Sequence, residues 1–285
     1  MHRHVALAAL TAAAFTLGAA AQASTIVLAN NPAPGDTFTN PGATNQGQAV
    51  GTTGWYYNNV RNSGTVGIDT QLPRSGNGSV FFASPSGSAK ADIEYLPSAV
   101  NVGGNFFSGA SLGSFQDLSS FGYEWYRAGT STNPAVQHPA LRVLLDLDGD
   151  LSTVGDRGGL VFERAYNALP TLTDQWVADT VAASTNLWSF GLGLPFADGG
   201  YGVTLGQWQA DSRFANAVII GFSAGVGSGW VGDFTGAVDN VTWTIANQTS
   251  SFNFEVEGAT PVPEPASLAL FGLALAGLAA ARRRA

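Results

Sequence analysis

Short runs in which apolar and polar side chains alternate recur along the chain. In Val241–Ile245 every second residue is apolar, and Tyr123–Arg127 follows a similar pattern, so apolar groups gather on one face of each strand. The pattern predicts eleven strands: Thr25–Leu28, Val80–Ala83, Ala91–Leu96, Gly122–Arg127, Leu141–Leu147, Gly159–Arg164, Gln175–Ala178, Asn186–Phe190, Ala217–Phe222, Ala237–Ile245 and Ser251–Val256.

One segment has helical rather than alternating spacing. Val203–Phe214 predicts a single short helix, and Thr204 stands where an N-cap residue is expected. About eleven short strands separated by Gly, Pro and Asn turns are typical of an all-β protein. We therefore expect a two-sheet antiparallel β-sandwich, jelly-roll-like, in one domain.

The N-terminus has the pattern of a secretory signal. A start that carries Arg3 precedes the apolar run Val5–Ala20, and the small residues Ala21 and Ala23 flank Gln22. Residues 1–23 are thus predicted to be a signal peptide that signal peptidase cuts after Ala23. The alternative, a buried N-terminal helix, fits less well because this Ala-rich run has no polar face.

The C-terminus has three parts. Pro263, Glu264 and Pro265 precede the apolar run Ala266–Ala281, which as a helix would extend about 24 Å. The chain then ends in an arginine cluster, which the positive-inside rule places on the cytoplasmic side. The cluster consists of Arg282, Arg283 and Arg284.

Residues 262–285 closely resemble the PEP-CTERM sorting signal of Gram-negative bacteria. The resemblance implies export across the inner membrane, transient anchoring by a transmembrane helix, and cleavage by an exosortase near Pro-Glu-Pro. The product would be located at the cell surface or outside the cell, in species that make extracellular polysaccharide and biofilm. The alternative is a plain anchor that is never cut. Residues 24–261 then form the ectodomain.

The net charge limits the classes of binding partner, and the cysteine content limits how the domain can be stabilised. Residues 24–262 carry 19 acidic and 8 basic side chains, a net charge of −11. Such a surface repels phosphate backbones, so nucleic acid is excluded as a partner. The chain has no cysteine, so no disulfide framework supports the exported domain.

An acidic loop is the first candidate metal site. Oxygen ligands at alternate positions beside a glycine are typical of calcium loops. The loop differs from an EF-hand because Leu151 and Arg157 replace its glycine and bidentate glutamate. A calcium-binding β-hairpin and a solvated acidic turn both remain open. The candidate ligands are Asp146, Asp148, Asp150 and Asp156.

Asp239 is the second candidate for calcium. It lies within an otherwise apolar strand, where an unpaired carboxylate is costly to bury. Its position is similar to that of a last-strand aspartate in jelly-roll carbohydrate-binding modules, and this resemblance implies a structural Ca²⁺. The alternative is an aspartate that fixes the adjacent loop through hydrogen bonds.

A wider resemblance concerns residues 120–245. Phe121–Arg127, Leu141–Asp148, Gly159–Glu163 and Gly225–Val241 resemble the jelly-roll or concanavalin-A-like sandwiches of many PEP-CTERM proteins. The resemblance implies a fold shared with lectins, and a fold alone does not assign a ligand.

Catalytic patterns are weak. His138 is the only histidine after the signal peptide, and no nucleophile elbow accompanies it. Glu94, Glu124 and Glu163 lie on predicted strands, where carboxylates usually face solvent. We therefore predict that the protein is not an enzyme.

Aromatic side chains are the candidate ligand platforms. Trp55, Tyr57 and Trp230 lie beside Gly-rich or polar segments, and sugars pack their C–H faces on such rings. The sequence thus predicts a non-catalytic, polysaccharide-binding β-sandwich with Ca²⁺ as a structural ion. Two alternatives stay open, namely a structural matrix protein without a specific ligand and a glycoside-acting enzyme.

Overall fold

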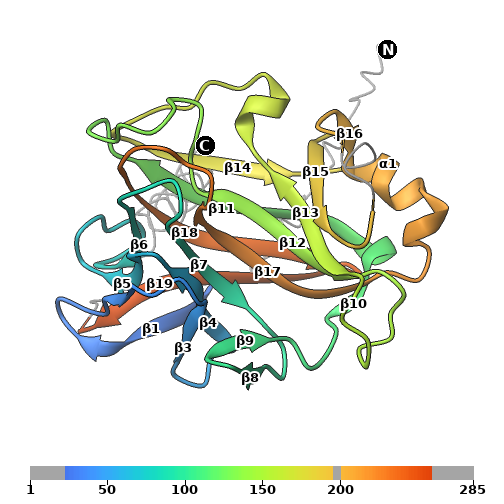
Figure 1. The fold of residues 1–285 in the computed structure, drawn as a ribbon, viewed down its shortest axis with the longest axis horizontal. Coiled ribbons are helices and arrows are strands. Elements are labelled where there is room, and N and C mark those ends of the chain that lie inside the picture. The colour runs from blue at the N-terminus through green and yellow to red at the C-terminus, as the bar shows by residue number, and fades with distance from the viewer. Residues whose placement is uncertain (1–22, 195–199, 259–285) are drawn as a thin grey trace, which may run out of the picture.

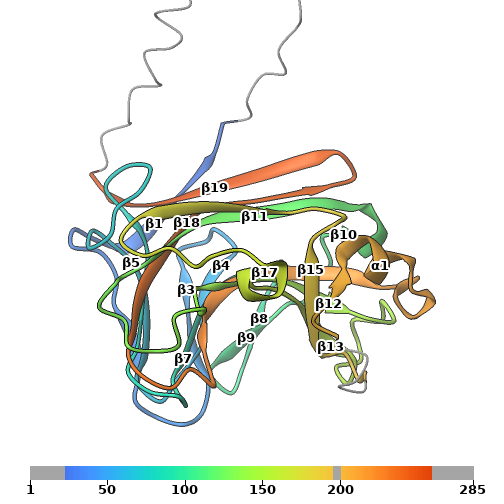
Figure 2. The same ribbon diagram turned by 90° about the horizontal axis from the view of Figure 1, so that it is seen from above.

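The computed structural model describes residues 23–194 and 200–258. These residues form two β-sheets that pack face to face, with one short α-helix at one end (Figures 1 and 2). The predicted all-β, two-sheet sandwich with one short α-helix is confirmed. The signal segment before Ala23 and the sorting segment 262–285 lie outside the described residues.

The eight-stranded sheet contains both ends of the described chain. Its main order is β1-β19-β18-β6-β5-β2, and β11 joins β18 to β14. The first strand runs parallel to the last, with Thr25 opposite Phe252. Its strands are β1 (Thr25–Pro32), β2 (Phe38–Asn40), β5 (Gly64–Asp69), β6 (Ser79–Ser84), β11 (Leu118–Arg127), β14 (Trp176–Val181), β18 (Phe234–Ile245) and β19 (Gln248–Glu257).

The nine-stranded sheet is made of the remaining long strands. Its order is β16-β15-β13-β12-β17-β7-β4-β3, with β10 beside β17. Its strands are β3 (Gln46–Val50), β4 (Trp55–Arg61), β7 (Lys90–Tyr95), β10 (Gly113–Ser114), β12 (Ala140–Asp146), β13 (Arg157–Phe162), β15 (Asn186–Gly191), β16 (Val203–Thr204) and β17 (Val218–Gly227).

The small elements lie around these sheets. Strands β8 (Val100–Val102) and β9 (Asn105–Phe107) form a separate hairpin, and 3₁₀ turns occupy Phe115–Asp117, Arg164–Asn167 and Ser212–Phe214. The predicted helix is shorter than its pattern. Helix α1 spans only Leu205–Ala210, because the chain turns at Asp211 into a 3₁₀ turn.

The predicted cap of this helix is confirmed. The Thr204 hydroxyl accepts from the backbone N–H of Gln207, and the Gln207 side chain accepts from the backbone N–H of Thr204. This reciprocal capping box satisfies two N–H groups that the helix itself cannot pair.

The hydrophobic core lies between the two sheets. Phe222 of β17 stacks on Trp243 of β18 with ring centroids 4.4 Å apart, and Phe121 of β11 packs on the same Phe222 ring. These rings come from opposite sheets, so their contacts hold the layers together. Within the described residues no helix is long and apolar enough to span a membrane; the predicted span at Ala266–Ala281 lies outside them.

Candidate functional site

Alternation in the nine-stranded sheet directs charged side chains away from the core. On β7, Ala91 and Ile93 face the other sheet, so Asp92 and Glu94 point to the outer face. On β12, Arg142 occupies the same outer face between two core residues. All three are nevertheless buried, and Asp92 is only 1% exposed. Buried charges of this kind require partners.

Asp92 sits between two cations. Its Oδ2 lies 3.1 Å from Lys90 Nζ, and its Oδ1 accepts from Arg142 Nη1 at 2.9 Å. Arg142 Nη1 also donates to Ser223 Oγ at 3.2 Å. Burial raises the pKa of Asp92, but the charges of Lys90 and Arg142 outweigh burial and hold its pKa below the usual range. Asp92 is therefore ionised and fixes the position of Arg142.

Gly225 makes this ion cluster possible. It lies opposite Asp92 across the β7–β17 pair. A Cβ atom at this position would lie 2.0 Å from Asp92 Oδ1, the oxygen that Arg142 binds. Any larger residue would therefore displace the carboxylate.

Glu94 is held by amides rather than by cations. Asn58 Nδ2 donates to its Oε2 at 2.6 Å, and Asn59 Nδ2 donates to its Oε1 and to Asp92 Oδ2, each at 3.0 Å. Burial, together with the neighbouring charge of Asp92, raises the pKa of Glu94. The two carboxyl groups of β7 therefore differ in their tendency to ionise.

The β8–β9 hairpin covers one side of these groups. Phe106 donates its N–H to Asn58 Oδ1 at 3.0 Å and accepts from Asn58 Nδ2 at 2.9 Å. Asn105 exchanges hydrogen bonds with Asn59, through the backbone N–H and the side-chain oxygen of Asn59. The hairpin thus turns an exposed sheet face into one wall of a hollow.

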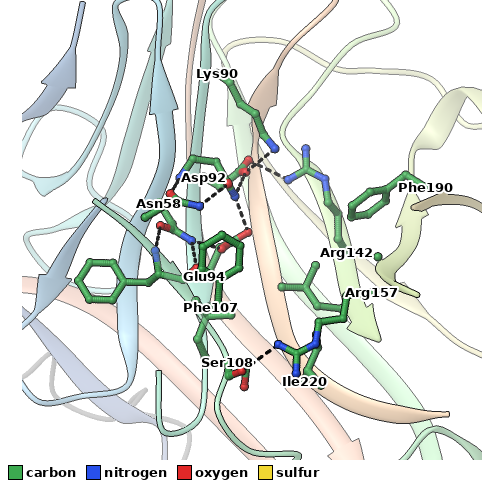
Figure 3. Close-up of a pocket in the computed structure, with 16 residues that line it drawn as sticks. Asn58, Lys90, Asp92, Glu94, Phe107, Ser108, Arg142, Arg157, Phe190 and Ile220 are labelled. Atoms are coloured by element: carbon green, nitrogen blue, oxygen red, sulfur yellow. Dashed lines mark hydrogen bonds and ion pairs between the residues drawn. The ribbon is translucent and has the colours of Figure 1, made fainter. Parts of the chain in front are cut away.

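Two adjoining hollows open on this face, with volumes of about 200 and 210 Å³. They share Lys90, Arg142 and Phe190, and we call them together the outer-face groove. Figure 3 shows the first hollow, with the charged side chains near its centre and Phe190 beside Arg142. The second is lined by Lys90, Ala140, Arg142, Val161, Glu163, Trp188, Phe190, Gly227, Ser228 and Trp230.

The groove continues past Trp230. A further hollow shares Glu163, Ser228 and Trp230 with the second one and adds Tyr166 and Tyr201. Those two tyrosine rings stack with centroids 4.4 Å apart. Aromatic rings therefore recur along the groove between polar and charged groups.

The structure corrects two of the three predicted aromatic platforms. Trp55 is 1% exposed and Tyr57 is fully buried, because the alternation of β4 turns both side chains into the core. Tyr57 Oη donates to Asp36 Oδ2 at 2.6 Å, an internal bond. Neither ring can contact a ligand, so the prediction for both was wrong. Trp230 does line the groove, although it is only 6% exposed.

The acidic loop brings three of its four predicted ligands together. Carboxylate oxygens of Asp146, Asp148 and Asp156 all lie within 4.8 Å of one another. Asp150 is not among them, because its Oδ1 accepts from the N–H and the hydroxyl of Ser152 at 3.0 and 2.7 Å. Arg157 Nε lies 3.0 Å from Asp146 Oδ2, so one cation already occupies one side of the cluster.

Asp239 lies in the other sheet, where backbone groups bind it. Its Oδ1 accepts from Phe254 N–H at 3.0 Å and its Oδ2 from Ser75 N–H at 3.2 Å. Burial raises its pKa to about 7. This geometry matches the alternative of a hydrogen-bonded aspartate that fixes a loop. Within the part of the chain that the structure describes, Asp239 belongs to no group of three possible metal ligands.

His138 is built into the core. Its ring stacks on Trp125 with centroids 4.6 Å apart, and Nε2 accepts from the backbone N–H of Arg164 at 2.9 Å. Nδ1 lies 3.0 Å from Tyr123 Oη. Burial lowers the pKa of His138 to about 4, so the ring is neutral at neutral pH. These contacts give His138 a structural role.

The remaining candidate carboxylates divide between the two sheets. Glu163 lines the groove and accepts from Trp188 Nε1 at 3.1 Å, and burial raises its pKa. Glu124 pairs with Arg74 at the eight-stranded sheet. Only Glu94 and Glu163 of the three therefore belong to the groove.

Sequence reasoning did not single out Lys90, Asp92 or Arg142. A signal was present in the segment Ala91–Leu96, where charged residues alternate with apolar ones on a predicted strand. That alternation indicates an outer face, but it does not show that a hairpin covers the face or that Arg142 of another strand meets Asp92.

The fold and groove define a class: an all-β, two-sheet sandwich with a polar and aromatic groove on one outer face. The end of the chain adds a more particular finding. Residues 261–284 match the family described as the PEP-CTERM protein-sorting motif, so the chain carries this motif at its C-terminus. The motif implies export and an anchored sorting signal that exosortase processes.

Two solved structures are similar at low identity. One is described as "Structural basis for the promiscuous specificity of the carbohydrate-binding modules from the beta-sandwich super family". It is 13% identical with a TM-score of 0.32, and the match covers 70% of this chain and 56% of the chain in that structure. Another is described as "CBM4 structure and function" and is 17% identical with a TM-score of 0.27. This match covers 65% of this chain and 88% of the chain in that structure. No curated protein matches the chain.

Proposed function

We propose that this is a non-catalytic, polysaccharide-binding protein of the cell surface or extracellular matrix, linked to exopolysaccharide or biofilm. The outer-face groove is the proposed binding site. The observation that supports it best is the continuity of the groove, since neighbouring hollows share Lys90, Arg142, Phe190 and Trp230. A continuous groove suits an extended polymer better than a single small molecule.

The chemistry of the groove suits sugars. Phe190 is 36% exposed at the junction of the two hollows and offers an apolar ring to sugar C–H faces. Glu163 and Ser228 lie in the lining of the second hollow and can exchange hydrogen bonds with hydroxyl groups. We propose a non-catalytic role because the carboxylates of Asp92 and Glu94 are held by cations and amides.

Affinity electrophoresis on a panel of bacterial and plant polysaccharides tests the proposal. We expect one polymer to retard the protein, and Phe190→Ala to weaken that retardation on the order of tenfold, because it removes a stacking surface. Ile26→Ala is the matched control, since Ile26 is exposed on β1 of the other sheet. Equal retardation of both variants would contradict the assignment of the groove.

A purely structural role is the second candidate, and one surface feature favours it. The β8–β9 hairpin and the acidic loop after β12 expose a set of apolar side chains around one hollow, namely Val100, Val102, Phe107 and Val154. Exposed apolar patches commonly mark contacts between proteins. Absence of retardation on every polymer, combined with concentration-dependent self-association in sedimentation velocity, would favour this role over polysaccharide binding.

We also propose Ca²⁺ as a structural ion at Asp146, Asp148 and Asp156. Adding Ca²⁺ should raise the melting temperature, because an ion that binds only the folded state stabilises it by about 2.7 kcal/mol at one hundred times its Kd. Differential scanning fluorimetry with Ca²⁺ and with chelator measures this effect. Asp148→Asn should abolish the difference, whereas Asp233→Asn, outside the cluster, should retain it. An unchanged melting temperature in chelator would exclude the ion.

A further inference from the structure

Arg142 offers unused hydrogen-bond donors to the groove. Only its Nη1 has partners among the described residues, Asp92 and Ser223, so Nη2 and Nε remain open. Neither of these nitrogens is among the fully buried polar atoms without a partner, so each keeps some contact with solvent, and Arg142 lines the groove. Arg142 lines both hollows and is 9% exposed.

The position of this guanidinium is fixed before any ligand arrives. Asp92 and Ser223 bind one edge, and Gly225 leaves the space that their contact requires. A guanidinium held on one edge presents its other edge as a rigid fork of parallel N–H groups. Such a fork matches the two oxygens of a carboxylate.

The local charge is unusual for this chain. Lys90 and Arg142 together carry two positive charges and share one direct partner, the carboxylate of Asp92, while Glu94 and Glu163 also line the groove. Residues 24–262 have 8 basic side chains and a net charge of −11, yet three of the basic side chains line the first hollow. The third is Arg157, which already pairs with Asp146.

We propose that the groove selects acidic polysaccharides and that Arg142, assisted by Lys90, binds the carboxylate of one sugar unit. This inference rests on the proposed polysaccharide-binding function and adds the class of ligand. The ligand carboxylate would pair with Nη2 and Nε of Arg142, close to the positive charge of Lys90. Phe190, at the same junction, would contact the ring of that sugar.

Besides Asp92, the acidic side chains that line the two hollows are Glu94 and Glu163. Burial raises the pKa of each, so repulsion of an incoming carboxylate is weaker than two ordinary glutamates would cause. Glu94 is further screened by the amides of Asn58 and Asn59.

The test compares matched polymers by affinity electrophoresis of the wild-type protein. The probes are the exopolysaccharide of the producing cells and polygalacturonate, each before and after chemical reduction of its carboxyl groups, together with dextran sulfate. We expect at least one native acidic polymer to retard the protein and its reduced form to retard it on the order of tenfold less. Because the protein is itself acidic, retardation reports a local site rather than general charge attraction.

The other possible results contradict either the carboxylate inference alone or the proposed function as well. Equal retardation by a native polymer and its reduced form would overturn the carboxylate inference and leave polysaccharide binding intact. Retardation by dextran sulfate alone would overturn the assignment to carboxylates. Retardation by no polymer, acidic or neutral, would overturn the proposed function as well.

Variants locate the site. Arg142→Gln should weaken retardation by the acidic polymer on the order of tenfold or more, and Arg142→Lys should recover only part of it, because a lysine keeps the charge without the fork. Arg74→Gln removes one positive charge at the other sheet and should change nothing. If Arg142→Gln strongly lowers the melting temperature, its loss of retardation is not informative. The Lys90→Gln variant then tests the site, together with the comparison of native and reduced polymers on the wild-type protein. If the acidic polymer retards Arg142→Lys and Lys90→Gln as strongly as the wild type, these residues do not bind its carboxylate.

Discussion

Replacing Trp55 with alanine is expected to lower the free energy of unfolding by about 3–5 kcal/mol, which is typical of a large aromatic removed from a core. Its ring lies within 6.1 Å of four aromatic rings drawn from both sheets: Tyr95, Trp243, Phe252 and Phe254. The side chain therefore joins β4 and β7 to β18 and β19, and its removal leaves a cavity between the layers.

Chemical denaturation measures this loss, and two variants serve as controls. Trp55→Phe should cost far less, because the indole Nε1 has no hydrogen-bond partner among the described residues and a ring is retained. Trp176→Ala on the half-buried face of β14 should cost about 1 kcal/mol or less. A Trp55→Ala protein that keeps wild-type stability but loses polymer binding would show that Trp55 is a ligand platform after all.

Acid is expected to destabilise the fold through His138. The buried ring has a pKa of about 4, whereas an unfolded histidine titrates near 6.5, so the unfolded state binds more protons between these values. Stability from the neutral ring is thus fully present above pH 6.5 and falls as the pH is lowered towards 4. The loss is roughly 3 kcal/mol, at about 1.4 kcal/mol for each pKa unit.

This loss must be measured as a difference between proteins. Asp239 has a pKa raised to about 7 by burial, so its contribution changes with pH in the opposite direction. Subtracting the unfolding free energy of His138→Gln from that of the wild type cancels Asp239. We expect the difference to shrink by roughly 3 kcal/mol from pH 7 to pH 4. A difference that is constant with pH would show that His138 does not titrate in this range.

The sequence predicted those strands in which apolar side chains form an uninterrupted row facing the core. Every predicted strand, from Thr25–Leu28 to Ser251–Val256, coincides with a strand of the structure. Strands β2, β3, β4 and β5 were among those missed, because Gly and polar residues interrupt their apolar pattern and their pairing partners help to determine their conformation. The helix was overextended because its end depends on Asp211, whose side chain accepts from the N–H of Arg213.

The groove was less predictable, for a physical reason. Its central contact joins Asp92 of β7 to Arg142 of β12, with β17 between these strands in the sheet. No local spacing links residues 50 positions apart. Trp55 and Tyr57 were misplaced for a related reason, since the loop before β4 suggested a surface position while the alternation within β4 directs both residues inward.

The two ends of the described chain lie in one layer, and the groove lies on the outside of the other. Strand β19 ends at Glu257, opposite Pro32 of β1, and the sorting motif begins only a few residues later. Figure 2 shows β1 and β19 on one side of the sandwich, with β8, β9 and β13 on the opposite side. The described chain therefore leaves the sandwich from the sheet that does not carry the groove. The proposed polymer-binding face and the end of the described chain therefore belong to different sheets of the sandwich.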